Sequence, residues 1–492
     1  MIPVSDAATV RARDLALINT LGIPGHTQME LAAHGAARLI HATLPAAAPT
    51  AILCGPGNNG GDGYVVARWL HALGHPVRLW APLPPRGPDA TKNADLCRAL
   101  SIPILPTAAA ALDGAACAID ALLGTGQRDA PRGILADGVH ALAAARAAGV
   151  MIHALDIPTG LCADTGQILG TDHVTADHTY TFGDHKQGLF CEPAASLSGL
   201  VTRIDLGLDL TAGIEGTPQP GAGLLEVADI AARMPVRGDA EAKWHRGHVA
   251  IRASGGAGVL AAHGAFCAGA GLVTLLVPRA DWAGLRGLWP EVILAEPDAL
   301  DPRRHDVLII GPGLGLGGDC EAEVTERWAR WPGALLADAD ALSILARVPQ
   351  PPATGSRIIT PHSAEAARLL GKTRAEVEAD RFRAATALGM RGVSVLKGPN
   401  TIVSTAGQQH AVVPVRCGRL ATAGSGDVLA GLIGGLLAQG CLARDAAIVG
   451  SWWHAHAGLQ MPRRGTAGDL LRAIRATAPD GLAEFSPLSG EC

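Results

Sequence analysis

The sequence contains two glycine-rich motifs, GPGNNGGDG at residues 55–63 and TAGSGD at residues 422–427, roughly a domain apart. The first follows the apolar run 51–54 and precedes the amphipathic stretch 64–73, which predicts a strand, a loop and a helix. A loop of this kind presents unpaired backbone N–H groups to an anion. The second motif opens the helix-like run 428–437, and its Asp427 places a potential general base beside the N–H groups. We therefore expect two active sites on one chain.

Around these motifs, short β-like runs alternate with Ala-rich helical stretches from about residue 50 onward. This alternation predicts an α/β fold of parallel sheets covered by helices. The expected strands are 51–54, 77–80, 116–121, 151–156, 178–182 and 201–206 in the first half, and 248–253, 272–277, 307–310, 334–337, 357–360 and 394–396 in the second. Helices at 11–19 and 29–41 are expected to pack onto the first sheet.

A Gly-, Pro- and Thr-rich segment at residues 208–235 interrupts the alternation and is the best candidate for a linker. A boundary near residue 220 predicts one domain over residues 1–215 and a second over residues 222–492. The length of 492 residues favours more than one domain, and 48% hydrophobic residues suffice for two cores.

Composition and charge limit which binding partners and which cellular compartment we expect for this protein. A net charge of −5, a pI near 6.4 and the lack of a basic run predict no binding to nucleic acid. Apolar stretches are too short and too rich in glycine to span a membrane. The ten cysteines include no CxxC pair, and the N-terminal residues lack a basic segment followed by an apolar one, so we expect a cytoplasmic protein.

GPGNNG also matches the GxGxxG spacing of nicotinamide-dependent dehydrogenases, so that class is an alternative. Those enzymes carry an acidic residue for the ribose about 20 residues after the motif. No Asp or Glu lies between Gly63 and Pro88. This absence disfavours an ordinary dehydrogenase.

Two further strand-end motifs, AIDALLGTGQRDAPRG at residues 118–133 and LDIPTG at residues 155–160, narrow the interpretation. With NNGGDG they resemble the epimerase domain of the NAD(P)H-hydrate repair family over about residues 10–210, which implies a Rossmann-like three-layer domain. The resemblance implies that the hydrated dinucleotide is bound by Asn58, Asn59, Gly60, Gly61, Asp62, Gly124, Thr125, Gly126, Gln127, Arg128, Asp129, Ala130 and Asp156. It also implies a potassium ion held by Asn59, Asp120 and Thr159.

The chemistry of Asn59, Asp120 and Thr159 agrees with a potassium site, because their oxygen atoms are ligands that suit a hard cation. The alternative is that Asp120 and Thr159 cap neighbouring helices. Lys186, in TFGDHKQGL, resembles a lysine of the same family, and with Asp156 it could shuttle a proton at the hydrated carbon. The sequence does not say which of the two is the acid, and a lysine can equally lie on the surface.

TAGSGD resembles the anion hole and base of the ribokinase superfamily, which implies a ribokinase-like three-layer α/β domain. The surrounding motifs resemble, in order, the ADP- or ATP-dependent NAD(P)H-hydrate dehydratase over about residues 225–475: HVAIRASGG (248–256), GAGLVTL (269–275), IIGPGLG (309–315), ADADAL (337–342), ITPHSAE (359–365) and LKGPNT (396–401). Sugar kinases share the GSGD-like element only, so a ribokinase-like small-molecule kinase fused to a nucleotide-binding domain is the alternative. Residues 256–269 are expected to form a loop shorter than is usual in the family.

The resemblance assigns roles in this second site. Gly315 and His362 would contact the hydrated dinucleotide, and Asp427 would contact it and act as the base. The adenine nucleotide would be bound by Lys397, Gly398, Pro399, Asn400, Thr401 and Gly426. A satisfied loop histidine at 362 and a helix N-cap at 427 are the structural alternatives.

Together these resemblances imply a bifunctional enzyme that repairs hydrated NADH and NADPH. The first domain would interconvert the R and S hydrates, and the second would dehydrate the S hydrate at the expense of ADP, with Mg²⁺, giving AMP and phosphate. The family resemblance also implies a homo-oligomer. A non-catalytic nucleotide sensor is a further alternative, and turnover of hydrate would exclude it.

Overall fold

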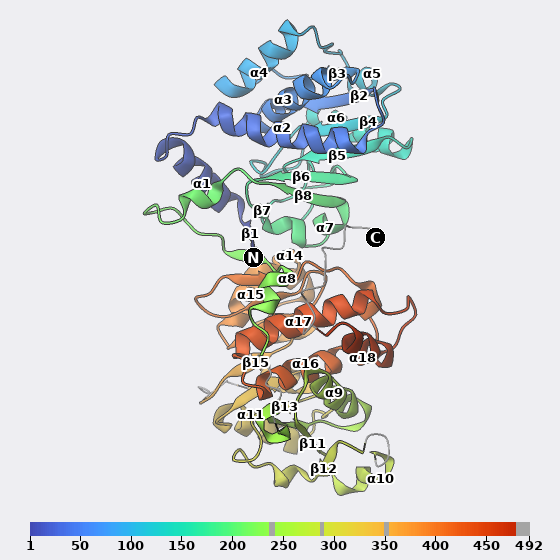
Figure 1. Cartoon of the computed structure of the whole chain (residues 1–492). Helices are drawn as coiled ribbons and strands as arrows, with labels where there is room; N and C mark the ends of the chain where they lie inside the picture. The colour runs from blue at the N-terminus through green and yellow to red at the C-terminus, as the bar shows by residue number, and fades with distance from the viewer. Residues whose placement is uncertain (236–241, 286–289, 349–353, 479–492) are drawn as a thin grey trace. The chain divides into compact units, whose positions relative to one another are not determined.

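The computed structural model describes residues 1–235, 242–285, 290–348 and 354–478, and the chain forms two compact units (Figure 1). One unit comprises residues 2–222, and the other comprises Met1 and residues 223–492. The end of the predicted second domain, beyond Ala478, lies outside the described residues. Both units have the α/β architecture expected from the alternation of strand and helix patterns.

The N-terminal unit is built on a six-stranded parallel sheet of order β3-β2-β4-β5-β6-β8. These strands are β2 (Thr50–Cys54), β3 (Val77–Trp80), β4 (Cys117–Ala121), β5 (Met151–Leu155), β6 (His178–Phe182) and β8 (Leu200–Ile204). A separate parallel pair joins β1 (Ile2–Ser5) to β7 (His185–Lys186), and neither strand was predicted. The helices are α1 (Ala7–Asn19), α2 (Gly25–Thr43), α3 (Asn58–Ala72), α4 (Pro88–Ala99), α5 (Ala108–Leu112), α6 (Ile134–Ala147) and α7 (Ala194–Leu197).

Alternating side chains explain why helices cover both faces of this sheet. Ile52 and Cys54 of β2 face a cluster shared with α2, α3 and α4, whereas Ala51 and Leu53 face a cluster shared with α5 and α6. Successive strand residues point to opposite faces, so an uninterrupted apolar strand needs a helical layer on each side.

The first glycine-rich motif is mostly helix, which corrects the predicted loop. Helix α3 begins at Asn58, so Gly60, Gly61 and Gly63 lie in its first turns. A side chain at Gly60 would collide with the Gly55 carbonyl oxygen, and a Cβ at Gly63 would lie 2.6 Å from the Cβ of Ala121. These glycines are required because the helix approaches the strand ends closely, not because the chain turns there.

The C-terminal unit contains a sheet in which the strand order runs β12-β11-β10-β13-β14-β15-β16-β17-β18, with β9 (Ala222–Leu224) next to β18. Its strands are β10 (His248–Arg252), β11 (Leu272–Leu276), β12 (Ile293–Ala295), β13 (Val307–Ile310), β14 (Ala334–Ala337), β15 (Arg357–Ile359), β16 (Val393–Leu396), β17 (Ile402–Ser404) and β18 (His410–Val412). Strands β10 to β16 pair in parallel, whereas β16–β17 and β17–β18 are antiparallel. The two antiparallel strands at this edge, β17 and β18, were not among the predicted strands.

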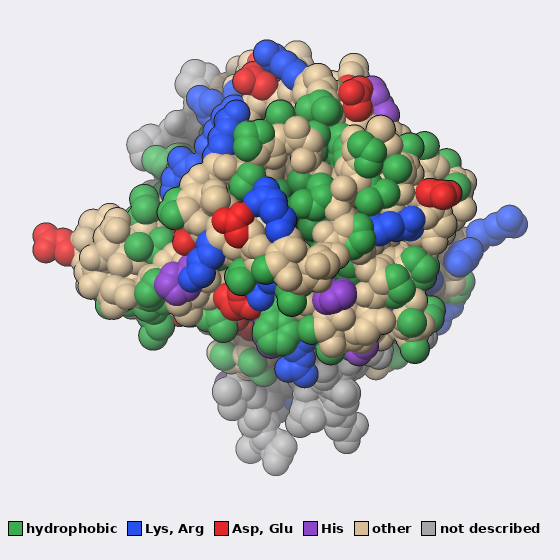
Figure 2. All heavy atoms as spheres, turned by 90° about the horizontal axis from the view of Figure 1, so that it is seen from above, with side chains coloured by type: hydrophobic (Ala, Val, Ile, Leu, Met, Phe, Trp, Pro, Cys, Tyr) green, Lys and Arg blue, Asp and Glu red, His purple; other side chains and the backbone are tan. Residues whose placement is uncertain are grey.

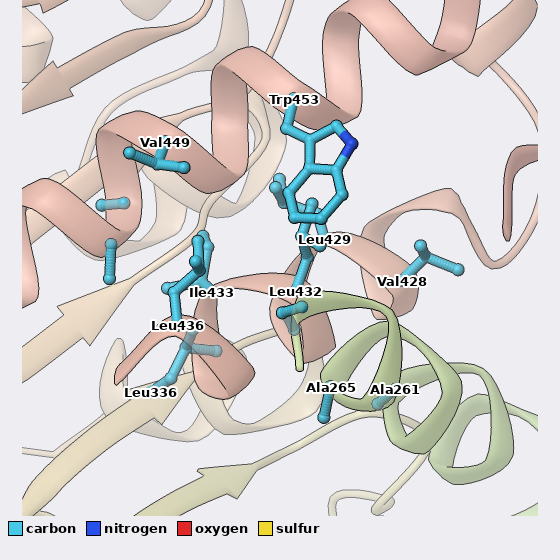
Figure 3. Close-up of a cluster of buried hydrophobic side chains, with 14 of the residues drawn as sticks. Ala261, Ala265, Leu336, Val428, Leu429, Leu432, Ile433, Leu436, Val449 and Trp453 are labelled. Carbon is cyan, nitrogen blue, oxygen red and sulfur yellow. The ribbon is translucent and has the colours of Figure 1, made fainter. Parts of the chain in front are cut away.

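A nearly all-apolar helix forms the centre of this unit. Helix α16 (Ser425–Ala438) packs between α9 (Gly255–Ala268) and α17 (Ala443–Leu459) (Figures 1 and 3). Figure 3 shows the labelled side chains of this core, which are Ala261, Ala265, Leu336, Val428, Leu429, Leu432, Ile433, Leu436, Val449 and Trp453. A helix that is hydrophobic all round is stable only when buried, which fixes the position of the TAGSGD motif at its start.

Residues 255–268 form α9, so the expected short loop at 256–269 is wrong. Small residues permit this helix to lie close to α16, since a Cβ at Gly264 or Gly431 would collide with the facing backbone. The other helices are α8 (Val227–Ala231), α10 (Trp282–Leu285), α11 (Gly318–Arg330), α12 (Asp340–Leu345), α13 (Ser363–Leu370), α14 (Arg374–Ala379), α15 (Arg381–Gly389) and α18 (Ala467–Ala476).

The surface in Figure 2 carries acidic and basic side chains interspersed with hydrophobic ones. Within the described ranges, no helix has the length and apolar character needed to cross a membrane.

Candidate active sites

Two of the three predicted potassium ligands bond to each other at adjacent strand ends. Asp120, on β4, is fully buried, and its Oδ2 accepts a hydrogen bond from the Thr159 backbone N–H at 2.7 Å. Its Oδ1 accepts from Thr159 Oγ1 at 2.8 Å and from the Leu122 N–H at 3.1 Å. Neither side chain caps a helix, which removes the capping alternative. Burial raises the pKa of Asp120 to about 6, although these hydrogen bonds lower it.

The third predicted ligand, Asn59, is buried in the first turn of α3. Neither its Oδ1 nor its Nδ2 has a hydrogen-bond partner, so the structure does not bond Asn59 to Asp120 or Thr159. A Cβ placed on Gly124 would lie 3.4 Å from the Asn59 side chain and 3.1 Å from Asp156 Oδ2, so both side chains face the segment after β4. A buried amide without partners costs about 1–3 kcal/mol. That cost is expected of a group that serves a ligand.

The predicted proton-transfer pair is present as a buried ion pair. Asp156 follows β5 directly, with φ of 67°, and its Oδ1 lies 2.5 Å from Lys186 Nζ. The lysine is 1% exposed, so the surface alternative is wrong, and its Nζ also donates to the Phe182 carbonyl at 2.6 Å. A left-handed conformation at a non-glycine residue is strained, and such strain is concentrated at functional sites.

Two more carboxyl groups lie within electrostatic reach of Lys186. Burial raises the pKa of Asp62 well above its ordinary value, Asp156 raises it further, and Lys186 opposes the change. Burial likewise raises the pKa of Asp14 on α1 to about 6, with Lys186 opposing and Asp156 adding to the rise. The raised pKa of Asp62 beside an ion pair makes this a cluster of groups that can donate and accept protons. Asp14 was missed because helix α1 carries no glycine-rich or strand-end signal.

Hydrogen bonds hold the predicted substrate-binding segment 124–130 in place. Gln127 donates from Nε2 to the Leu161 carbonyl at 2.9 Å and accepts from the Gly160 N–H at 2.9 Å. The Thr125 N–H donates to Asp156 Oδ2 at 3.2 Å, which links the segment to the ion pair. Arg128, in contrast, is 63% exposed and pairs with Asp164 at 3.4 Å. Gln127 therefore shapes the segment, whereas Arg128 is accessible to a charged ligand.

In the C-terminal unit, Asp427 lies in the first turn of α16 without capping it. The N-cap is Gly424, whose φ is 85°, and a Cβ there would collide with Leu260. The first N–H groups of any helix have no partner within it, so the start of α16 can bind an anion. Burial raises the pKa of Asp427 to about 6; Asp338 adds to the rise and Lys397 opposes it. A carboxyl with this pKa is suited to act as a base near neutral pH.

Lys397, predicted to bind the nucleotide, is held by two acids. Its Nζ lies 3.0 Å from Asp338 Oδ1 and 3.9 Å from Glu365 Oε2. Burial lowers the pKa of Lys397, but these carboxylates outweigh the effect and raise it. A Cβ on Gly426 would lie 3.4 Å from Lys397 Nζ, so the cation faces the start of α16. Asp338 and Glu365 lie in the quoted motifs ADADAL and ITPHSAE, but their pairing with Lys397 was not predicted.

His362 is the N-cap of α13. Its Nδ1 accepts from the N–H groups of Ala364 and Glu365 at 3.1 and 3.4 Å, so the ring proton is on Nε2. The side chain is still 54% exposed, and burial, with Lys397 and Arg368 adding to it, lowers its pKa. It can thus cap the helix and offer a neutral N–H donor to a ligand.

Arg381 holds the segment 397–401 in place through hydrogen bonds to the backbone at its start. This arginine was not predicted from the sequence. Arg381 is 2% exposed and donates to the carbonyls of Leu396 and Lys397, each at 3.3 Å. Gly398, with φ of 152°, is required because a Cβ would lie 2.8 Å from the guanidinium. Asn400 has φ of 55° and Thr401 Oγ1 donates to the Gly398 carbonyl, so the segment is a tight turn that includes Pro399.

Gly315 lies on a second loop, after β13. Its φ is 88°, and its N–H donates to Asp340 Oδ2 at 2.8 Å. Parallel strands end at one edge of the sheet, which is where the loops holding Gly315, His362 and Lys397 begin. Among the residues that the structure describes, no cluster of three or more His, Cys, Asp or Glu side chains could hold a metal ion.

Comparison with known proteins adds family information for both units. Residues 251–480 match the family described as NAD(P)H-hydrate dehydratase, and residues 25–188 match the family described as YjeF-related protein N-terminus. The bifunctional NAD(P)H-hydrate repair enzyme Nnr of Escherichia coli (strain K12) is 35% identical over 491 residues, covering 96% of this chain and 92% of that protein. The enzyme of the same name from Thermanaerovibrio acidaminovorans is 36% identical over 497 residues, covering 95% of each chain.

Among solved structures, an ADP/ATP-dependent NAD(P)H-hydrate dehydratase from Bacillus subtilis, co-crystallized with ATP/Mg²⁺, is 23% identical with a TM-score of 0.48. The match covers 51% of this chain and 96% of that one.

Proposed function

The chain belongs to the family of bifunctional NAD(P)H-hydrate repair enzymes, and from this premise we propose how its two sites divide the repair of hydrated NADH and NADPH. The N-terminal unit interconverts the R and S hydrates. The C-terminal unit dehydrates the S hydrate at the expense of ADP. We assign these activities to catalytic domains at residues 1–215 and 222–492.

In the epimerase site, Asp156 and Lys186 move the proton at the hydrated carbon. The ion pair supports this role, because Asp156 Oδ1 and Lys186 Nζ lie 2.5 Å apart, close enough for a proton to pass between them. Asp62, whose pKa is raised mainly by burial, is a neighbouring group that can exchange protons with this pair. The segments 58–62 and 124–130 bind the dinucleotide, with Arg128 exposed toward its phosphates.

Asn59, Asp120 and Thr159 would hold a potassium ion. Their fit is supported by the unpartnered Asn59 amide and by the buried Asp120 carboxylate, which has no cationic partner among the described residues. When bound, the ion would supply positive charge beside the diphosphate of the substrate.

In the dehydratase site, Asp427 takes the proton of the ring hydroxyl as the oxygen attacks the terminal phosphoryl group of ADP. The P–O bond to AMP breaks, while the N–H groups at the start of α16 and Lys397 stabilise the transferring charge. Loss of phosphate from the carbon and of a proton from its neighbour then restores the ring double bond. The products are the dihydronicotinamide, AMP and phosphate.

Mg²⁺ would accompany the nucleotide, since it binds phosphate oxygens and keeps several waters. Gly315 and His362 would position the hydrated ring, and segment 397–401 with Gly426 the nucleotide. Self-association is a further proposal from the family resemblance, and cytoplasmic location is a further proposal from the cysteine pattern.

One structural observation carries this proposal: Lys397 and a partly buried Asp427 meet at the N-terminus of a helix. The relatives match this chain over nearly its whole length. The test is incubation of the protein with NADH hydrate and ADP while NADH absorbance is recorded. Absorbance should return with one AMP released per NADH. A stable phosphorylated product would indicate a kinase instead, and binding without turnover a sensor.

A further inference from the structure

A carboxylate with no role so far lies at the centre of the dehydratase site. Asp338 follows β14 directly and is 2% exposed. Its Oδ1 accepts from Lys397 Nζ at 3.0 Å and from Thr360 Oγ1 at 2.8 Å. These partners follow β16 and β15, so one oxygen atom joins three neighbouring strand ends.

The second oxygen of Asp338 faces the catalytic helix. A Cβ built on Gly426 would lie 3.8 Å from Asp338 Oδ2 and 3.4 Å from Lys397 Nζ. The residue next to Gly426 is Asp427. Asp338 and Lys397 therefore both lie near the start of α16, next to the proposed base Asp427.

We propose that Asp338 is a positioning residue for dehydration, which orients Lys397 and keeps a negative charge beside Asp427. This inference rests on the proposed function of the site. A buried charge pair fixes its members more than it stabilises the fold, because desolvation offsets much of the attraction. Without Asp338, Lys397 would be free to pair with Asp427 and leave the nucleotide.

Asp338 acts on Asp427 with little competition from other charges. Burial raises the pKa of Asp427, Asp338 raises it further, and Lys397 opposes both. Glu365 on α13 lies 3.9 Å from Lys397 Nζ, and His362 is the N-cap of that helix.

The helices packed against α16 add no charge that changes this balance. His263 on α9 and His454 on α17 have pKa values lowered by burial to about 4, so both are neutral above pH 5. The Nε2 of His454 donates to the Ser425 carbonyl at 2.9 Å. Asp469 and Arg472 on α18 pair with each other.

Asp338→Asn in the full-length protein tests the inference, with S hydrate, ADP and saturating Mg²⁺. The amide keeps the shape and an acceptor oxygen but removes the charge. We expect kcat to fall roughly 10- to 100-fold, since a small displacement of a phosphoryl-binding cation has effects of this size. The acidic limb of the rate profile should move to lower pH by about one unit or more, because Asp427 loses a like-charged neighbour.

Two further variants separate position from charge. Thr360→Val removes a hydrogen bond to Asp338 but leaves its charge, so kcat should fall while the acidic limb stays in place. Glu326→Gln, at an exposed residue of α11 that is 60% accessible, makes the same change of net charge and should alter neither quantity.

The outcomes are distinct. If the wild type does not restore NADH absorbance, the proposed function fails. If the wild type is active and Asp338→Asn keeps both its kcat and its acidic limb, the inference is overturned. If Asp338 has only a structural role, Asp338→Asn should have a lower unfolding midpoint, while the acidic limb of the rate profile of its folded fraction stays at the wild-type position. That result also overturns the inference. If Asp338→Asn does not fold, Thr360→Val tests the inference. A kcat of Thr360→Val equal to that of the wild type then overturns it.

Discussion

Lys186 Nζ lies 2.5 Å from Asp156 Oδ1, and both side chains are largely buried, at 1% and 13% exposure. The lysine is the shared cation of a site that also contains Asp62 and Asp14. Removal of either partner would leave the other charge uncompensated in the interior, which is strongly unfavourable. The charge balance of this site therefore depends strongly on Lys186, and Arg13 also lowers the pKa of Asp14.

Lys186→Met should abolish most epimerisation while dehydration of pure S hydrate continues. The loss of the proton-carrying partner is expected to reduce the rate about 10²–10⁴-fold. The measurement is the interconversion of R and S hydrates by chromatography. Exposed Lys92→Met is the matched control and should epimerise normally. Epimerisation close to the wild-type rate in Lys186→Met would remove the pair from the mechanism.

Asn59→Leu should separate ligand binding from folding. Asn59 has no hydrogen-bond partner, so an apolar replacement of similar size should leave the unfolding midpoint unchanged or raise it. Epimerisation should fall, and its response to potassium chloride, compared with sodium chloride at equal ionic strength, should disappear. A destabilised variant that still responds to potassium would mean that Asn59 supports the fold. Equal wild-type rates in both salts would contradict the potassium site itself.

Asp427→Asn should lower dehydration about 10²–10⁴-fold with little change in stability. Gly424, not Asp427, is the N-cap of α16, so no capping bond is lost. The return of NADH absorbance from S hydrate and ADP reports the rate, and thermal unfolding reports the fold. Epimerisation in the same preparation serves as the internal control. Near-normal dehydration would exclude Asp427 as the base.

Dehydration by the wild type should rise with pH through about 6. Asp427 must be ionised to accept the hydroxyl proton, and burial raises its pKa from an ordinary value of 3.8 to about 6. Activity is thus lost as pH falls through 6, and each further unit lowers kcat/KM about tenfold for a single proton. Initial rates from about pH 5 to pH 8 locate the limb. A limb near pH 4 would show that the base is not this buried carboxyl.

The two activities should survive separation of the chain. The structure forms compact units of residues 2–222 and, with Met1, 223–492. Fragments 1–215 and 222–492, expressed separately, should each fold cooperatively and keep one activity, since each unit has its own core. Assays of both reactions on each fragment test the division. An inactive, unfolded fragment in either case would show that the domains depend on each other.

The sequence alone was sufficient for the α/β architecture of both units. Uninterrupted apolar runs such as 51–54 and 307–310 predicted the parallel strands, because a strand buried on both faces needs no polar alternation. Short elements escaped prediction: β1, β7, β9 and β12 have too few residues to show a period. The helical start of α3 was missed because glycine disfavours helices, and only the approach to β2 and β4 explains its use there.

The chemical state of the sites was decided by tertiary structure. Asp62, Asp120 and Asp427 are ordinary aspartates in the sequence, and burial raises the pKa of each. The pairing of Lys186 with Asp156, and of Lys397 with Asp338, joins strand ends that are distant along the chain. Local sequence fixes backbone propensity and the identity of each side chain. Desolvation and charge pairing depend on distances between elements, and these exist only once the sheets have formed.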